Sequence, residues 1–168
     1  KQYAFTCMNG MGHVEKLQQY FADDKIIAGT ALIATVLNGP GDVDFMGKRG
    51  AGKMNMANLT EKPDEMTHRL FDEFKKAQMN PTLTTNFKGT LMTKVVFNSV
   101  MNTLCTLFEM QMGEYGNFEK AYDLSRQLID EAYDVCERAG ITLVSTRDEE
   151  LHALDYNCRV TMPLHYPS

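Results

Sequence analysis

The stretch "MTKVVFNSVMNTLCTLF", Met92 to Phe108, decides the fold of the second half of the chain. Most of its residues are Val, Phe, Met and Leu, and Lys94 is the one charged residue between Gly89 and Glu109. An amphipathic helix on a protein surface carries far more charge than this. We therefore expect a helix that is buried on most of its sides.

Three polar side chains, Lys94, Asn98 and Asn102, interrupt this apolar segment at four-residue steps. Each step turns an α-helix by about 400°, so the three line one face over about 12 Å. One interpretation is an ordinary solvent-facing side, widened by Ser99 and Thr103. The other is the wall of a polar cleft. It is favoured because Asn is a weak helix former and charges are scarce here.

The chemistry of these side chains points to a small polar ligand. An ammonium group in a cleft can hold an anion, and burial lowers the pKa of a lysine so that it gives up a proton more readily. An Asn amide both donates and accepts hydrogen bonds, which suits a neutral oxygen or a carboxylate. The spacing alone thus predicts a site for an anionic or carbonyl-bearing small molecule.

Outward from this helix, the chain divides into a strand-rich part and a helical part. Before residue 60 we expect a strand at 2–8, a glycine turn, a short helix at 13–21, strands within 25–37, and a hairpin of 42–47 with 52–59. After it we expect helices at 63–77, 87–111, 117–140 and 146–158, with a loop at 80–86. Gly113 and Gly116 would stop the long helix, and Asn117 would cap the next one. Strands followed by helices predict two compartments that meet near residues 59–64.

Composition excludes several classes of partner. The 168 residues carry a net charge of -5 and no basic run longer than two, which argues against nucleic acid and anionic membrane surfaces. No apolar stretch approaches the roughly 20 residues needed to span a bilayer. Four scattered cysteines without a CxxC motif suit a reduced, cytoplasmic protein. The four histidines share no metal-like spacing, so no metal site is expected.

The two ends of the sequence suggest a piece of a longer protein. The chain opens at Lys1, without Met, and runs directly into a strand-like segment. It stops at Ser168 after "MPLHYPS", without a closing helix.

Four segments in order resemble the ketopantoate reductase (2-dehydropantoate 2-reductase) family: "CMNGMG", "NGPGDVDFMG", "KVVFNSVMN" and the terminal "YPS". The resemblance covers nearly the whole chain. It implies an α/β protein in which a partial Rossmann sheet (residues 1–60) is followed by an incomplete all-α helical domain (residues 61–168). This helical domain would be similar to the C-terminal domain of 6-phosphogluconate dehydrogenase, with the active site in the cleft between the domains.

The same resemblance implies an activity and roles for individual residues. The family reduces 2-dehydropantoate to pantoate with NADPH, on the route to pantothenate and coenzyme A. Lys94 would be the general acid that protonates the alkoxide, and Asn98 and Asn102 would bind the substrate. Ser168 would hold the substrate carboxylate.

On the cofactor side, the resemblance points to the glycine turn after the first strand. Asn9 and Gly10 match residues that contact the cofactor near the nicotinamide, and Thr35 falls near a backbone contact to it. However, no Gly-x-Gly-x-x-Gly occurs in this sequence, although a dinucleotide site at the start of a Rossmann domain requires one. We therefore expect this chain by itself neither to bind NADPH tightly nor to turn over.

Two alternatives stay open at this point. The first is a paralogous reductase that acts on another 2-oxo acid, with NADH rather than NADPH also undecided. The second is a non-catalytic helical dimerisation module, in which the polar stripe has no chemical role. A homodimer is compatible with each of these.

Overall fold

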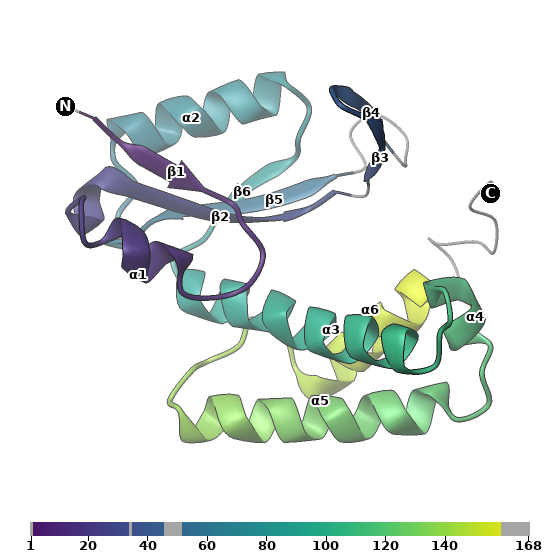
Figure 1. The fold of residues 1–168 in the computed structure, drawn as a ribbon. Coiled ribbons are helices and arrows are strands. Elements are labelled where there is room, and N and C mark those ends of the chain that lie inside the picture. Colours follow the sequence, from purple (N-terminus) through teal and green to yellow (C-terminus); the bar gives the residue numbers. More distant parts are fainter. Residues whose placement is uncertain (1, 34, 46–51, 159–168) are drawn as a thin grey trace. The chain divides into compact units, whose positions relative to one another are not determined.

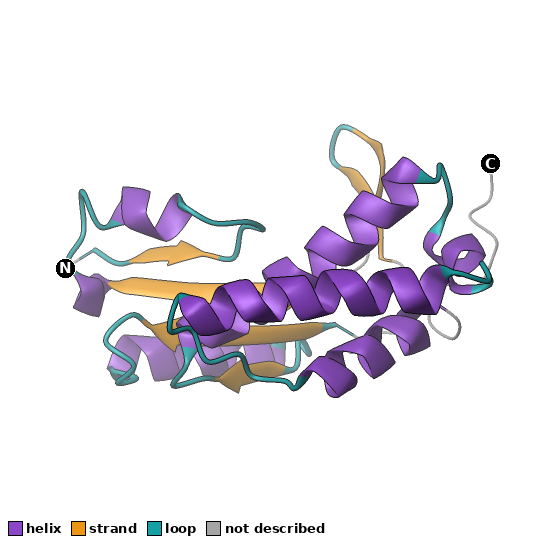
Figure 2. Cartoon of the chain, turned by 90° about the horizontal axis from the view of Figure 1, so that it is seen from below, coloured by secondary structure: helices purple, strands orange, loops and turns teal. Residues whose placement is uncertain are grey.

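The structure is a computed structural model that describes residues 2–33, 35–45 and 52–158 (Figure 1). Its contacts divide the chain into two compact units, with the division between Leu91 and Met92. The sequence predicted the boundary near residues 59–64. The structural division falls later because the helix and strand that follow residue 64 pack on the sheet of the first unit. Figure 2 shows the same chain with its strands in orange and its helices in purple.

The first unit contains a mixed four-stranded sheet in the order β1-β2-β5-β6. Its strands and connecting helices are β1 (Ala4–Thr6), α1 (His13–Leu17), the 3₁₀ turn η1 (Asp23–Lys25), β2 (Ile26–Leu32), β5 (Lys53–Asn58), α2 (Glu65–Lys76) and β6 (Pro81–Leu83). Strands β1 and β2 are parallel, as are β5 and β6, whereas β2 and β5 are antiparallel. The sheet is thus two βαβ units joined through their inner strands.

Different helices cover the two faces of this sheet (Figure 1). On one face the ring of Phe5 in β1 lies 5.5 Å from the ring of Phe74 in α2. On the other face a small core joins strands β2 and β5 to α1 and to the first turn of the next helix; its members are Ala28, Ala57, Phe87, Val14, Leu59 and Leu91. Side chains alternate along each strand, so β2 sends Ala28 to one face and its neighbours to the other.

Gly29, in the middle of β2, is required by a close backbone approach. A Cβ atom placed there would lie 2.7 Å from the backbone oxygen of Asn55 in β5 and 3.7 Å from the ring of Phe5. We expect Gly29→Ala to lower the free energy of unfolding of this chain by about 1–3 kcal/mol, because the two strands must move apart. Urea unfolding measures the change. Gly39→Ala is the matched control, since a Cβ at Gly39 meets nothing within 4 Å. Equal stability of both variants would contradict the account.

A separate two-stranded ribbon lies between β2 and β5 in the sequence. It consists of β3 (Thr35–Gly39) and β4 (Asp42–Phe45), which pair antiparallel around the "NGPG" turn. The predicted hairpin of 42–47 with 52–59 is therefore wrong. Strand β5 pairs with β2 instead, because its alternate residues Met54 and Met56 are buried in the sheet, whereas all four residues of β4 are exposed.

The predicted loop at 80–86 is also partly wrong, because Pro81–Leu83 forms the edge strand β6. Proline is tolerated in an edge strand, where no neighbour needs its missing N–H group. The pairing is made by flanking residues as well, since the backbone N–H of Thr84 donates to the oxygen of Met56 over 3.0 Å.

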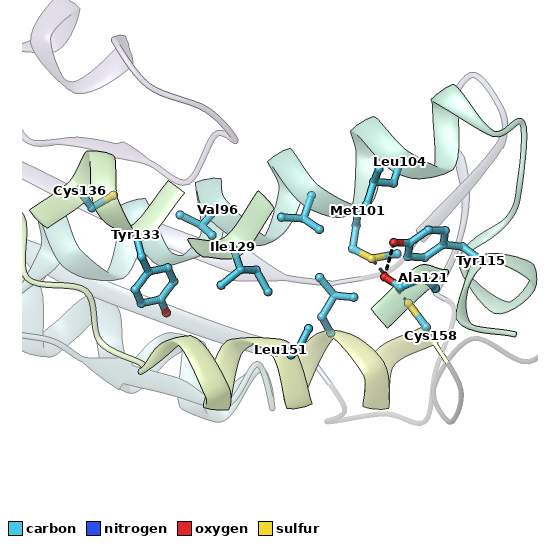
Figure 3. Close-up of a cluster of buried hydrophobic side chains, with 12 residues drawn as sticks. Val96, Met101, Leu104, Tyr115, Ala121, Ile129, Tyr133, Cys136, Leu151 and Cys158 are labelled. Carbon is cyan, nitrogen blue, oxygen red and sulfur yellow. Dashed lines mark hydrogen bonds between the residues drawn. The ribbon is translucent and has the colours of Figure 1, made fainter. Parts of the chain in front are cut away.

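The second unit is helical. Its elements are α3 (Phe87–Leu107), which begins in the first unit, then α4 (Met112–Gly116), α5 (Ala121–Arg138) and α6 (Arg147–Tyr156). One core joins them, and Figure 3 shows how side chains from all four helices converge on it. Tyr115 is fully buried, and its hydroxyl donates to the backbone oxygen of Ala121 over 2.7 Å and pairs with Ser125 Oγ at 2.8 Å.

Helix α3 ends earlier than predicted. Glu109 adopts a left-handed φ of 54°, and the backbone N–H groups of Glu109 and Met110 donate to the oxygens of Thr106 and Cys105. This is the Schellman pattern of a helix C-terminus, here with Glu in the place that glycine usually takes.

The glycines expected to stop α3 lie elsewhere, because Gly113 and Gly116 belong to α4. Asn117 is wrong as an N-cap as well. It caps the C-terminus of α4, and Lys120 precedes the first turn of α5. Within the described residues, no helix combines the length and hydropathy that a membrane crossing demands.

Candidate functional site

The polar stripe of α3 is shielded at one end and open at the other. Lys94 and Asn98 are half-buried, whereas Asn102 is exposed. Val96 and Val100, on the opposite side, are 2% and 1% exposed and belong to the core of the second unit. The solvent-facing interpretation therefore fits Asn102, and the polar cleft at Lys94 and Asn98 stays a prediction.

The neighbouring polar residues of α3 differ from this pair. Ser99 is exposed, and its hydroxyl donates to the backbone oxygen of Val95 over 2.7 Å, so its hydrogen-bonding capacity is used within the helix. Thr103 is exposed as well. The groups of this helix best placed for chemistry are thus the Lys94 ammonium and the Asn98 amide.

The glycine turn that the sequence singled out directly follows β1. Asn9 and Gly10 are exposed there, and Gly10 and Gly12 have left-handed φ values of 86° and 88°. A Cβ on either glycine would meet nothing within 4 Å. The glycines are therefore required by the backbone conformation rather than by close packing.

Thr35 is the first residue of β3, in the separate two-stranded ribbon that follows β2. Strands β1 and β2 are parallel, so their carboxyl ends point the same way, and ligands of open α/β sheets bind outside such ends. Asn9 follows β1 and Thr35 follows β2. Strand β2 continues to Leu32, four residues past Ala28, which pairs with the last residue of β1. Thr35 thus begins further along the strand direction than the end of β1. Ser168 lies outside the described residues.

The second unit also has an open pocket of about 660 Å³, which the sequence did not predict. It lies where α5 ends and α6 begins; its walls include Tyr133, Cys136, Ile141, Leu143 and Arg147. The start of α6 could have been recognised from the sequence, because Thr146 and Glu149 have the T-x-x-E spacing of a capping box. The structure contains this capping box.

Arg147 ties the two helices of this pocket together. Its Nη2 donates to Asp134 and Glu137 over 2.8 Å each, and its Nη1 donates to the backbone oxygen of Asp130 over 2.9 Å. The hydrogen bonds to Asp134 and Glu137 raise the pKa of Arg147 further above its ordinary value. These three acidic residues lie on one face of α5 at i, i+4 and i+7, so the guanidinium of Arg147 can contact all three at once.

Glu150 is the buried carboxyl of this unit, 5% exposed, and accepts a hydrogen bond of 2.8 Å from Ser145 Oγ. Burial raises the pKa of Glu150, and the hydrogen bond from Ser145 only partly offsets this. Its neighbour Glu149 behaves in the opposite way, because the backbone and side-chain hydrogen bonds of Thr146 lower the pKa of Glu149.

These opposite shifts predict opposite pH dependences. A group whose pKa is higher in the folded than in the unfolded state adds to the free energy of unfolding most below its unfolded-state pKa. This added stability is lost as the pH rises through its folded-state pKa. The stability of the wild type relative to Glu150→Gln should therefore fall as pH rises above about 4. The stability of the wild type relative to Glu149→Gln should rise between about pH 3 and 6. A carboxyl with a lowered folded-state pKa stabilises the protein only once it is ionised. Urea midpoints across this range test both, and the same trend in both variants would refute the assignment.

No group of three or more His, Cys, Asp or Glu side chains is arranged to hold a metal ion in residues 2–33, 35–45 and 52–158.

Two family models match this chain in the order that their names imply. The model described as "Ketopantoate reductase PanE/ApbA" matches residues 2–60, and the one described as "Ketopantoate reductase PanE/ApbA C terminal" matches residues 86–168. This chain belongs to the ketopantoate reductase family. A curated relative, the 2-dehydropantoate 2-reductase of Streptococcus pyogenes serotype M6, is 27% identical over 169 residues, which is all of this chain and 53% of that protein. The chain thus spans about half the length of the curated relatives that it matches.

Solved structures share the fold of this family member. A D-mandelate dehydrogenase in complex with NADH and anilino(oxo)acetate matches with a TM-score of 0.85 at 24% identity, over 99% of this chain and 52% of that one. The 2-dehydropantoate 2-reductase of Geobacter metallireducens matches with a TM-score of 0.78 at 24% identity, over 99% and 54%. The predicted fold class, a partial Rossmann sheet followed by a helical domain, is confirmed.

Proposed function

We propose that the protein containing this chain reduces 2-dehydropantoate to pantoate with NADPH. The observation that carries this proposal is the half-buried Lys94–Asn98 turn of α3, within the region that matches the C-terminal model of a family named for that reaction. A curated relative that carries the same activity in its name supports the same substrate class.

The proposed roles follow from what reduction of a ketone needs. Negative charge builds on the ketone oxygen as the carbonyl carbon is reduced, and a nearby ammonium both stabilises that charge and supplies the proton. Lys94 takes this role. Asn98, Asn102 and Ser168 bind the polar groups of the substrate, where an amide or hydroxyl can donate to a carboxylate.

When bound, NADPH supplies the hydride. The turn at Asn9 and Gly10 fits the nicotinamide end of such a cofactor, because its left-handed glycine leaves open space at the carboxyl edge of the sheet. Thr35, which follows β2 in the sequence, would contribute a backbone contact. The part of a dinucleotide site that recognises the phosphates requires a glycine fingerprint that this sequence does not contain.

A second candidate is reduction of another 2-oxo acid, with NADH as the donor. It is supported by the fold match to a D-mandelate dehydrogenase bound to NADH and anilino(oxo)acetate. The two candidates share the roles of Lys94 and Asn98 and differ in the group beside the ketone.

A substrate screen of the full-length protein separates these candidates. We expect kcat/KM for 2-dehydropantoate with NADPH to exceed that for benzoylformate or pyruvate by at least about 100-fold, since a site built for a substrate hydroxyl strongly rejects analogues that lack it. The measurement is NAD(P)H oxidation followed at 340 nm with each acid and each cofactor. Preference for benzoylformate with NADH would assign the second candidate.

Location and assembly complete the proposal. Cys7, Cys105, Cys136 and Cys158 are not joined by disulfides, which suits a reducing compartment, and we infer a cytoplasmic protein. A homodimer remains a prediction. We assign no role to nucleic acid or to a membrane surface.

A further inference from the structure

Thr93, the residue before Lys94, is joined to a distant part of the second unit. The backbone N–H of Val144 donates to Thr93 Oγ1 over 3.1 Å, across 51 residues of sequence. The side chain of Val144 is 54% exposed, so its packing contributes little to this contact. The hydrogen bond therefore joins α3 to the connection between α5 and α6 mainly through the Val144 backbone.

That connection, residues 141–146, is itself held firmly. The backbone N–H of Ile141 donates to the oxygen of Cys136 over 2.9 Å, which closes the end of α5. At the other end, the buried hydroxyl of Tyr133 lies 3.0 Å from the backbone oxygen of Ser145 and 3.2 Å from that of Thr146, which accept from it. Val144 thus presents its N–H from a segment fixed on both sides.

Ser145 adds a buried link to this segment. Its hydroxyl donates to Glu150 Oε2 over 2.8 Å and pairs with the Tyr133 hydroxyl at 3.0 Å. Tyr133 and Glu150 are each 5% exposed. Hydrogen bonds from Tyr133 in α5 and to Glu150 in α6 therefore support this segment at Ser145, the residue that follows Val144.

We propose that Thr93 is a positioning residue for Lys94: by accepting the Val144 N–H, it fixes the rotation of this turn of α3 and hence the direction of the Lys94 ammonium. A rotation of about 10° moves a group about 6 Å from the helix axis by about 1 Å. A misplacement of about 1 Å can cost about 100-fold in rate. Thr93 acts on Lys94 through the helix and touches no reacting atom.

The test compares four single variants and one double variant of the full-length protein. Thr93→Val keeps the shape and removes the acceptor, Thr93→Ser keeps the hydroxyl, and Thr103→Val makes the same change at an exposed threonine of the same helix. We expect Thr93→Val to lower kcat about tenfold with KM for the 2-oxo acid within twofold, and the other two to stay within twofold of wild type. Tyr133→Phe should lower kcat in the same direction, but not further in the Thr93→Val background.

A second readout does not depend on turnover. The ε-carbon resonance of Lys94, assigned with labelled lysine, should move in Thr93→Val and Tyr133→Phe and stay in place in Thr93→Ser and Thr103→Val. Unchanged kcat and an unmoved resonance in folded Thr93→Val would overturn the proposal. Should that variant fail to fold, the resonance in Tyr133→Phe decides in the same way.

This inference rests on the proposed function, and Lys94→Ala separates the two. If Lys94→Ala retains full reductase activity, the proposed role of Lys94 fails. If Lys94→Ala is inactive while Thr93→Val is fully active with an unmoved Lys94 resonance, only the positioning role of Thr93 fails.

Discussion

Lys94→Ala in the full-length protein should lower kcat for reduction of the 2-oxo acid by about 100- to 10,000-fold, the usual contribution of a general acid. The alkoxide that forms would lose both its proton donor and its stabilising charge. KM should change much less, because the substrate contacts proposed for Asn98 and the other residues are retained. Steady-state kinetics under saturating cofactor measure both parameters.

Lys88→Ala is the matched control for this substitution. Lys88 lies in the first turn of the same helix and is exposed, so removing its charge should leave kcat within twofold of wild type. Equal, small effects of the two substitutions would favour the non-catalytic interpretation, in which the stripe of α3 is only a polar surface.

The largest effect on stability should come from Tyr115→Ala, with a loss of about 3–5 kcal/mol in the free energy of unfolding. The ring is fully buried where α3, α4 and α5 converge (Figure 3), so truncation leaves a cavity. It also removes the hydroxyl that Ser125 Oγ and the Ala121 oxygen use as a partner. Urea unfolding of this chain, followed by circular dichroism, measures the loss.

Two further variants show which part of Tyr115 matters. Tyr122→Ala removes a tyrosine from the adjoining helix α5 that is 46% exposed, and it should cost less than about 1 kcal/mol. Tyr115→Phe keeps the ring and should cost about 1–3 kcal/mol for the unpaired buried groups. A Tyr115→Ala variant as stable as Tyr122→Ala would show that this core is wrongly described.

Helix ends show what the sequence could predict and what it could not. Helices α2, α3 and α5 end in the same hydrogen-bonded pattern, with left-handed residues at Gln78, Glu109 and Gly140. Only Gly140 carries the residue type that signals this conformation. The end of α5 was therefore predicted correctly, whereas α3 was extended to residue 111. The other two helices accept a left-handed side chain at a cost of about 1–2 kcal/mol, which packing offsets.

Strand pairing was the least readable feature of the fold. The segments that became β1, β2 and β5 were recognised as strands, because their apolar residues cluster or alternate. Which strands pair with one another was not predicted, because the pairing depends on which side chains the sheet buries. Strand β5 pairs with β2 and not with β4, its neighbour in sequence, and this pairing places Met54 and Met56 in the sheet core. Three-residue β6 has too little sequence to show any period.

The candidate site was likewise predicted only in part. The four-residue spacing of Lys94 and Asn98 placed both on one face of α3, where both are half-buried, and the glycine turn was recognised from its composition. The exposure of Asn102 was not predicted, because spacing shows that residues share a face but not how far along the helix that face is covered. The anchor at Thr93 was missed for a similar reason, since its partner is a backbone N–H 51 residues away.

The most direct test is a crystal structure of the full-length protein with NADP⁺ and its 2-oxo acid. We predict that Lys94 Nζ lies within about 3.2 Å of the ketone oxygen, with the Asn98 amide bonded to the same ligand. A Lys94 side chain directed into bulk water, with the substrate bound elsewhere, would contradict the account.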